Sequence, residues 1–451
     1  MSLKKNALAT VALTGIAVAV SSAYAAGFQL SEQSSLGLGR AFAGAGIVGD
    51  DLSAVFYNAA GMTLLPGTQI QAGSVYIDVD APFTGKDPVT GRAIQDNGRL
   101  KGQAIPAGYI THQVNDQLWL GLGMTVPYGM GTEYSGYWAN AGKGNQSMIM
   151  TIDINPNVAY KVSDKLSIGG GVSLQYAKAE LGQATVPAGE GYGIDSVVKG
   201  DSWAWGWNIG LMYQPTETLR LGLAYRSNVC HDAEGDLKIS SNLHEHPALS
   251  MSQDLQMAAG LGQLIQGVYN DFKVRVRTPD TIMATATWEA TDDLRLSGLV
   301  RWAKWSNLGS LHIHSSGIQL KNSLMSGGAN TSDIQENVYE WKDTWLFSVG
   351  ADYRLNNEWT IRGGLAYETG AVDKEELRPA TIPDVDRVWF SLGGTYKYSK
   401  QIQIDFGATY LMGVGNMDLY SEADDNGQYH KVGEYDSMSS YIIGAQVQYR
   451  F

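Results

Sequence analysis

Two pairs of histidines stand at alternate positions of the sequence and could bind a metal ion. They are His244 with His246 and His312 with His314. Alternate residues of a β-strand project from the same face, so either pair could supply two imidazole ligands. Histidines at such positions are common in surface loops that bind nothing. We therefore predict no metal site and no cofactor.

Other motifs that could carry chemistry lack the context they require. Gly44, Gly46 and Gly49 match the dinucleotide fingerprint G-x-G-x-x-G, but they follow no strand pattern and open no βαβ unit. We interpret them as flexible backbone. The sequence has no G-x-S-x-G motif, and few histidines are expected to face inward, which argues against a lipid hydrolase. The lone Cys230, expected to face inward beside Arg226, can form no disulfide bond within the chain.

Charged residues recur on strand faces that should point inward. Between residues 219 and 225 the apolar residues occupy alternate positions, which leaves Arg220 and Arg226 on the opposite face. The same rule places Lys342 and Asp352 inside. Interior charges are usual in membrane barrels, where salt bridges hold the wall to a plug. Only a cation next to an apolar pocket would indicate an anionic amphiphile as cargo.

These side chains must be positioned by strands, and the last stretch of the chain shows the pattern most clearly. Apolar residues alternate from Tyr441 to Phe451, with Gln446, Gln448 and Arg450 between them. Such alternation indicates one face toward lipid and the other toward a wet interior.

Six short polar turns alternate with seven longer connections along the chain. The turns are Asn115-Asp116, Ser163-Asp164, Pro215-Thr216-Glu217, Thr291-Asp292-Asp293, Asn356-Asn357 and Ser399-Lys400. The longer connections cover about residues 80–101, 129–145, 180–201, 231–272, 306–340, 369–386 and 415–437. This pattern predicts an all-β fold, a closed transmembrane barrel of fourteen antiparallel strands with both ends in the periplasm.

Residues 1–25 have the pattern of a secretory signal peptide. Lys4 and Lys5 precede an apolar run, and Ala23-Tyr24-Ala25 forms a cleavage site before Ala26. No later stretch reaches the ~20 consecutive apolar residues that a transmembrane helix needs, so strands must make any membrane crossing. The net charge of −13 argues against a nucleic-acid partner.

Residues 26–67 do not alternate and precede the expected barrel, which we assign to residues 68–451. The segment contains a helical patch from Asp51 to Tyr57, with Asp50 as its N-cap. Fourteen strands would enclose an open channel, so we expect this segment to plug the lumen as a hatch. A periplasmic tail is the alternative, but the segment is too apolar for a solvated tail.

The sequence after the expected cleavage site is Ala26-Gly27-Phe28-Gln29-Leu30, followed by Gly37-Leu38-Gly39-Arg40-Ala41. Later motifs are Val75-Tyr76-Ile77-Asp78, Tyr128-Gly129, Trp205-Gly206-Trp207-Asn208 and Ile382-Pro383-Asp384-Val385-Asp386-Arg387. Together and in this order they closely resemble the FadL family of outer-membrane transporters of long-chain fatty acids.

The resemblance implies a hatch inside the barrel, an apolar pocket, and exit of the cargo through a gap at a kink in the third strand. Pro127, Tyr128 and Gly129 occupy that position, and proline and glycine favour an interrupted ladder. It also implies that Phe28 and Leu30 contact the cargo or form a displaceable stopper. Lys342 falls on a position implicated in handling the carboxylate. The alternation of inward and outward residues along the strand also places Lys342 inside. The structural alternative is a salt bridge from Lys342 to Asp343 or to the hatch.

The resemblance extends to partners and location. It implies a monomer in the outer membrane of a Gram-negative bacterium, surrounded by outer-membrane lipid and lipopolysaccharide, that takes up a fatty acid or another hydrophobic molecule. Two departures from the family concern candidate site residues. The hatch motif Asn-Pro-Ala, which we assign to gating, reads Asn58-Ala59-Ala60 and lacks the stiffening proline. An arginine for the ligand head group is not matched in Tyr176-Ala177-Lys178-Ala179-Glu180.

We therefore expect a transporter for long-chain fatty acids that works by ligand-gated passive diffusion. Uptake of aromatic or aliphatic hydrocarbons is the nearest alternative, and a neutral cargo would make Lys342 dispensable for binding. A general diffusion porin is opposed by the apolar hatch.

Overall fold

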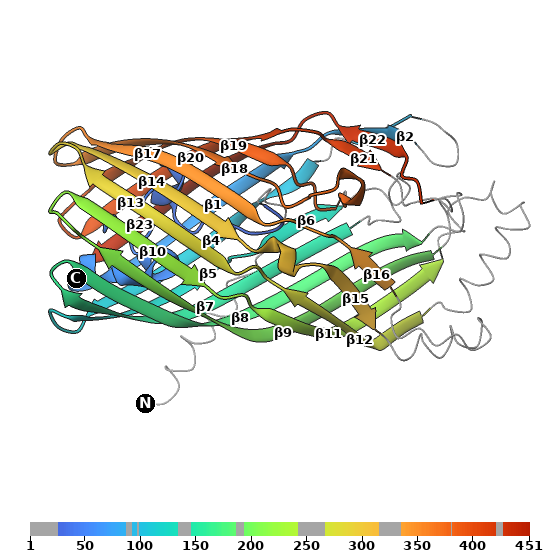
Figure 1. Cartoon of the computed structure of the whole chain (residues 1–451), viewed down its shortest axis with the longest axis horizontal. Coiled ribbons are helices and arrows are strands. Elements are labelled where there is room, and N and C mark those ends of the chain that lie inside the picture. Colours follow the sequence, from blue (N-terminus) through green and yellow to red (C-terminus); the bar gives the residue numbers. More distant parts are fainter. Residues whose placement is uncertain are drawn as a thin grey trace, which may run out of the picture.

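The strands form one closed antiparallel barrel in the computed structural model (Figure 1). The structure describes residues 26–86, 93–96, 99–133, 146–185, 194–241, 267–314, 335–379, 381–420 and 427–451. The barrel closes because the first wall strand, β1, pairs with β4 on one side and with the last strand, β23, on the other. The predicted fold class, a barrel of fourteen strands, is confirmed.

Several of the fourteen wall strands are interrupted and therefore consist of two segments. The wall comprises β1 (Thr68–Asp80), β4 (Arg99–Gln113), β5 (Leu118–Thr125) with β6 (Gly129–Glu133), β7 (Gln146–Ser163), β8 (Leu166–Thr185), β9 (Ile194–Tyr213), β10 (Leu219–Arg226) with β11 (Cys230–Ser241), β12 (Gly267–Arg277) with β13 (Thr281–Glu289), β14 (Leu294–Ala303) with β15 (Ser310–His314), β16 (Gln335–Val338) with β17 (Thr344–Arg354), β18 (Trp359–Glu368), β19 (Asp386–Lys397), β20 (Ile402–Val414) and β23 (Ser439–Arg450).

Smaller elements lie outside the wall ladder. A second sheet contains β2 (Phe83–Lys86), β3 (Ala93–Asp96), β21 (Asp418–Tyr420) and β22 (Lys431–Tyr435). The helices are α2 (Ser35–Leu38), α3 (Ala54–Tyr57), and the 3-10 helices η1 (Ala59–Leu64), η4 (Trp305–Asn307) and η5 (Glu375–Leu377). Among the described residues, no helix is long and apolar enough to cross a membrane.

All six predicted turns join neighbouring wall strands, but some strands run further than predicted. β8 extends to Thr185 and β9 begins at Ile194, inside the connection predicted at residues 180–201. β11 likewise continues to Ser241. On β11 the alternation is inverted, with Asp232, Glu234 and Lys238 exposed and Ala233, Leu237 and Ile239 buried inside. A strand with a charged outer face lacks the apolar outer face by which lipid-facing strands are recognised in a sequence. The predicted signal peptide, residues 1–25, lies outside the described residues.

The burial pattern is the reverse of that in a soluble protein. Trp205 and Leu392 on the outer face are 67% and 71% exposed, whereas Asp405 and Gln448 on the inner face are fully buried. The interior is filled by the N-terminal segment, whose residues from Ala26 to Leu65 are almost all buried (Figure 1, blue). We call residues 26–67 the hatch.

The hatch packs against glycines of the wall. A Cβ atom at Gly407 would overlap the carbonyl oxygen of Ser35, and one at Gly364 would overlap the backbone of Arg40. Glycine is therefore needed where the two backbones approach. One prediction about the hatch was wrong. Its helix does not run from residue 51 under an Asp50 cap: α3 begins at Ala54, and Asp50 instead binds an arginine.

Candidate functional site

An apolar pocket lies inside the barrel between the hatch and the wall. Inward side chains of β7, β8, β9, β11 and β12 form most of its lining, and Phe28 of the hatch closes it. The lining residues are Phe28, Ile149, Thr151, Ala177, Lys178, Ala179, Leu181, Val198, Gly200, His231, Ala233, Phe272, Val274, Val276, Thr278, Leu308, Tyr339 and Ile382. Its free volume is about 60 Å³. Because sites for small ligands usually measure hundreds of Å³, a long acyl chain would fit here only if side chains of the lining moved.

Phe28 is held in an aromatic cluster. Its ring centroid lies 4.8 Å from that of Trp305, 6.0 Å from that of Tyr128 and 6.2 Å from that of Trp341. The Nε1 atoms of Trp305 and Trp341 are buried and have no hydrogen-bond partner among the residues that the structure describes. A polar ligand group could accept from these two donors, since an unpaired buried donor is costly. No sequence pattern distinguishes these two tryptophans from those on the lipid face.

The third wall strand is interrupted at the predicted position. β5 ends at Thr125 and β6 begins at Gly129. Thr125 pairs with Asp153 of β7, and Gly129 pairs with Met150 of the same strand. The three residues 126–128 therefore lie opposite only two residues of β7, residues 151 and 152. On the other side, β4 pairs with β5, and the described strands show no ladder between β4 and β6. Backbone pairing of the wall is therefore incomplete here.

The hatch completes the hydrogen bonding of this interruption from inside. The Gly129 amide donates to the Phe28 carbonyl oxygen at 3.0 Å, and the Leu30 amide donates to the Pro127 carbonyl oxygen at 2.8 Å. The side chain of Gln33 both donates to and accepts from the backbone of the residue before Pro127. The segment that carries Phe28 is thus bonded directly to the interrupted strand, and movement of one must disturb the other.

Lys342 does not lie where strand parity placed it. It precedes β17, which begins at Thr344, so the alternation of that strand does not extend to it. Its side chain is 45% exposed, and its Nζ atom lies 3.9 Å from a carboxylate oxygen of Asp373. Lys342 is not among the residues that line the pocket. The alternative partner Asp343 instead accepts from Trp302 Nε1.

The segment Asn58-Ala59-Ala60 packs against the wall. The Asn58 side chain caps η1 by accepting from the Ala60 amide at 3.1 Å. Its amide group donates to the backbone of β9, at Leu211. A Cβ atom at Gly169 would lie 2.6 Å from the backbone of Ala59 and Ala60. The segment is thus well fixed without the proline, and its role in gating stays a prediction.

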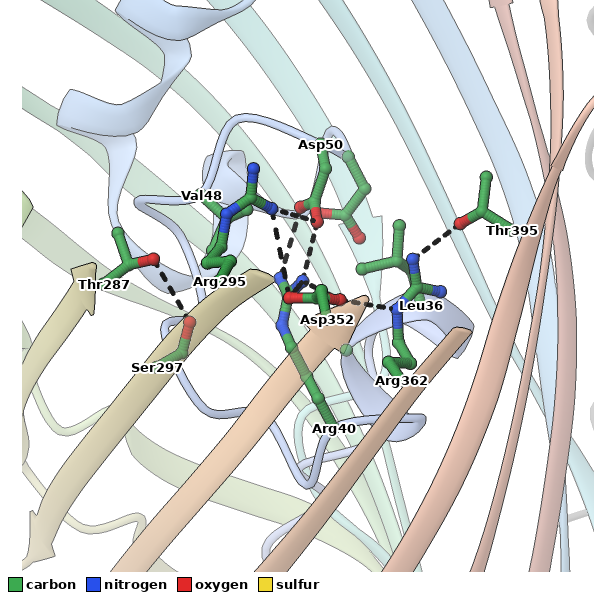
Figure 2. A network of polar contacts seen from close by, with 12 residues as sticks. Leu36, Arg40, Val48, Asp50, Thr287, Arg295, Ser297, Asp352, Arg362 and Thr395 are labelled. Carbon is green, nitrogen blue, oxygen red and sulfur yellow. Dashed lines mark hydrogen bonds and ion pairs between the residues drawn. The ribbon is translucent and has the colours of Figure 1, made fainter. Parts of the chain in front are cut away.

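A network of buried charges fixes the middle of the hatch to the wall (Figure 2). Arg40 is 2% exposed and binds Asp50 of the hatch at 2.6 Å and Asp352 of β17 at 3.3 Å. Arg362 of β18 binds Asp352 at 2.9 Å, and Arg295 of β14 approaches Asp50 at 3.6 Å. Burial alone would raise the pKa of Asp50, but the three arginines hold it well below its ordinary value. As predicted, inward charges tie the wall to the plug.

A second buried group of charges lies beneath the interrupted strand. Arg301 of β14 donates to Glu368 at 2.8 Å and to Ser31 of the hatch at 2.7 Å. Glu32 is 1% exposed, and one of its carboxylate oxygens has no hydrogen-bond partner in the described part of the chain. Burial raises the pKa of Glu32 to about 7. Sequence reasoning missed Glu32 because the hatch has no alternation that would indicate which residues are buried.

The family model described as outer membrane protein transport protein (OMPP1/FadL/TodX) matches residues 16–451. The chain belongs to this family. The long-chain fatty acid transport protein of Escherichia coli is 30% identical over 434 residues, which covers 91% of this chain and 93% of that protein. Outer membrane protein P1 of Haemophilus influenzae is 28% identical and covers 89% of each chain. The FadL-family relatives are transporters and channels, so the chain is an outer-membrane transport protein and not an enzyme.

Solved structures of FadL-family proteins share the fold. A Pseudomonas aeruginosa FadL homologue superposes with a TM-score of 0.79 at 23% identity, over 94% of this chain and all of that one. The toluene transporter TbuX of Ralstonia pickettii gives 0.62 at 18% identity, over 94% and 99% of the two chains. At this identity the likeness establishes the architecture alone.

Proposed function

We propose that this protein takes up long-chain fatty acids, or related hydrophobic molecules, by ligand-gated passive diffusion across the outer membrane. The cargo displaces Phe28, enters the apolar pocket, and leaves through a lateral opening at Pro127, Tyr128 and Gly129. The observation that supports this proposal is the direct bonding of Phe28 and Leu30 to the interrupted strand. A hydrophobic cargo also gains more by leaving sideways into lipid than by entering the aqueous periplasm.

The carboxylate of a fatty acid needs polar partners near the pocket. Lys342 supplies a cation, and the unpaired indole N–H groups of Trp305 and Trp341 supply donors beside Phe28. Asn58, Ala59 and Ala60 hold the hatch while its first residues move. We further propose that the protein acts as a monomer, surrounded by outer-membrane lipid and lipopolysaccharide.

The apolar lining favours uptake of aromatic or aliphatic hydrocarbons as the second candidate function. Among the described residues of the lining, Lys178 is the only lysine or arginine, and its side chain is on the outward-facing parity of β8 and is exposed. A neutral cargo would fit such a lining without any ion pair.

Mass spectrometry of lipids bound to the protein, extracted gently from its native membrane, separates the two functions. We expect a linear fatty acid, and uptake of a radiolabelled long-chain acid by cells that depends on the protein. Phe28→Ala should enlarge the pocket and increase retention of the bound acid. A bound neutral hydrocarbon, with no dependence of acid uptake on the protein, would overturn the fatty-acid proposal and favour the second function.

A further inference from the structure

The wall is interrupted at a second place, between β12 and η4. The ladder between β13 and β14 ends at Thr281 and Ala303, and one further backbone bond joins Lys304 to Asp280. Among the described residues, the ladder between β12 and β15 consists of the pairs Lys273–His314 and Val274–Ile313. No described backbone hydrogen bond joins residues 275–279 to residues 305–312. Figure 1 shows β12, β15 and β16 beyond this interruption.

A groove of about 730 Å³ borders the second interruption. It is formed by β11, β12 and the chain that follows η4, and it is lined by Asp232, Ala233, Glu234, Lys273, Val274, Arg275, Arg277, Asn307, Leu308 and Gly309.

Strand parity places the groove on the outer face and the pocket on the inner face. Lys273, Arg275 and Arg277 alternate along the exposed side of β12, whereas Val274 and Val276 between them line the inner pocket. Three residues, Ala233, Val274 and Leu308, line both spaces. A single layer of side chains therefore separates the outer groove from the pocket.

The groove carries a cation that is free to bind an anion. Lys273 pairs with Glu234 at 2.7 Å, and Arg275 pairs with Asp232 at 2.5 Å. Arg277 has no ion-pair partner within the described part of the chain. With three cations and two carboxylates the groove has a net charge of +1, although the whole chain carries −13.

The groove also lies beside groups that favour a membrane surface. Trp203 and Trp205 are more than half exposed on the outer face of β9, the strand that pairs with β11. Outward tryptophans concentrate at the boundary between lipid and water, where the head groups of amphiphiles lie. An amphiphile in the outer leaflet would therefore present its head group at this level and its chain to the wall.

We propose that this groove is a lateral loading site for a carboxylate amphiphile from the outer leaflet. Arg277 binds the carboxylate, and the acyl chain crosses the partition at Leu308 into the apolar pocket. The inference rests on the proposed function and adds to it a route into the pocket through the wall.

The test uses full-length protein in native outer membranes and a fatty acid that carries a diazirine near its carboxyl group. We expect photolabelling of residues 307–309 and of β12 in addition to the pocket. Arg277→Gln should lower labelling of the groove and the initial rate of uptake by roughly three- to fivefold, the effect of one exposed charge pair. Arg277→Lys should retain both. Arg354→Gln, an exposed arginine beside the Thr291–Asp293 turn, is the matched control.

A second variant fills the groove without touching its charges. A Cβ atom at Gly309 would have no other atom within 4 Å, so Gly309→Trp has room for a side chain. We expect it to slow uptake, and unchanged labelling and uptake in both Gly309→Trp and Arg277→Gln would overturn the loading site. Ala179→Trp fills the inner pocket and not the groove, so it tests the proposed function independently of the loading site. If Ala179→Trp also leaves uptake unchanged, the proposed function itself fails. If Gly309→Trp releases bound lipopolysaccharide without slowing uptake, the groove is a lipopolysaccharide site and our assignment is wrong.

Discussion

Gly27 determines how closely the first residues of the hatch approach the aromatic cluster. Its φ angle is +64°, a conformation that residues with a side chain rarely adopt. A Cβ atom there would lie 2.8 Å from the rings of both Trp305 and Trp341. Glycine thus allows the backbone to pass beneath the two indoles and places Phe28 in the pocket. The position of Phe28 therefore depends on the glycine before it as much as on its own phenyl ring.

Lys342 is a candidate for contact with the carboxylate of the cargo, although it lies outside the pocket lining. Because it is 45% exposed and already near Asp373, its contribution should be about 1 kcal/mol, roughly a fivefold change in affinity. We expect Lys342→Met to weaken binding of a fatty acid by that factor and to leave binding of its methyl ester unchanged. Affinities of both ligands for both proteins test this. An equal loss for acid and ester would mean that Lys342 has a structural role.

Glu32 should make the stability of the hatch depend on pH. Burial raises its pKa to about 7 from an ordinary value of 4.5, so the folded state binds this proton more tightly than the unfolded state. Its contribution is therefore fully present below pH 4.5 and is lost as the pH rises to about 7, by up to about 3 kcal/mol. Glu32→Gln should raise the unfolding temperature at pH 8 and change it little at pH 4.5.

The measurement for Glu32→Gln is heat-dependent migration of the purified protein at the two pH values. Glu217→Gln, in the exposed turn between β9 and β10, controls for the loss of a negative charge. The same shift of the unfolding temperature at both pH values would contradict an ionisation of Glu32 within this range.

At the scale of elements, alternation predicted which residues face inward within one strand segment but not beyond an interruption, and the only interruption predicted was the one marked by Pro127 and Gly129. Arg220 and Arg226 face inward as predicted and donate to hatch carbonyl oxygens, because alternation holds along β10. The interruption at residues 227–229 resets that alternation. Cys230 therefore falls on the outward parity of β11, beside the buried His231, and not inside. Lys342 was misplaced for the same reason. Interruptions arise from tertiary contacts that local periodicity does not contain.

The interrupted third strand should control release of the cargo. Replacing Gly129 by leucine adds a side chain where the strand bonds to the Phe28 carbonyl, and we expect slower uptake with an unchanged unfolding temperature of the barrel. Gly363→Leu is the matched control, because a Cβ atom at Gly363 makes only ordinary contact with Leu392 on the lipid face. The measurement is the uptake rate of cells that contain equal amounts of wild-type protein or of either variant. Normal uptake by Gly129→Leu would count against this exit route.

At the scale of the whole molecule, the hatch is held at two separated places that differ in chemistry. Its first residues bond to the interrupted strand and fill an apolar pocket, whereas residues around Arg40 and Asp50 join the buried charge network of the wall (Figure 2). Uncharged contacts can be exchanged for contacts with a hydrophobic cargo. Buried ion pairs cannot, because separating them leaves uncompensated charge. We infer that the first residues move during transport while the charged region stays in place.

The last prediction follows from this division. Arg40→Ala removes both ion pairs of Arg40 and leaves Asp50 and Asp352 with fewer partners, a change that typically costs about 3–5 kcal/mol for buried pairs. The wall should survive, because its ladders do not depend on Arg40, but the hatch should loosen and admit small solutes. Swelling of liposomes in sugar solutions measures the permeability of the barrel directly.

We expect wild-type protein to pass no sugar and Arg40→Ala to pass it. Arg354→Gln, which removes an exposed ion pair with Asp293, should behave as wild type. If Arg40→Ala liposomes stay impermeable while the barrel remains folded, the charge network does not hold the hatch, and the contacts around Phe28 must do so alone.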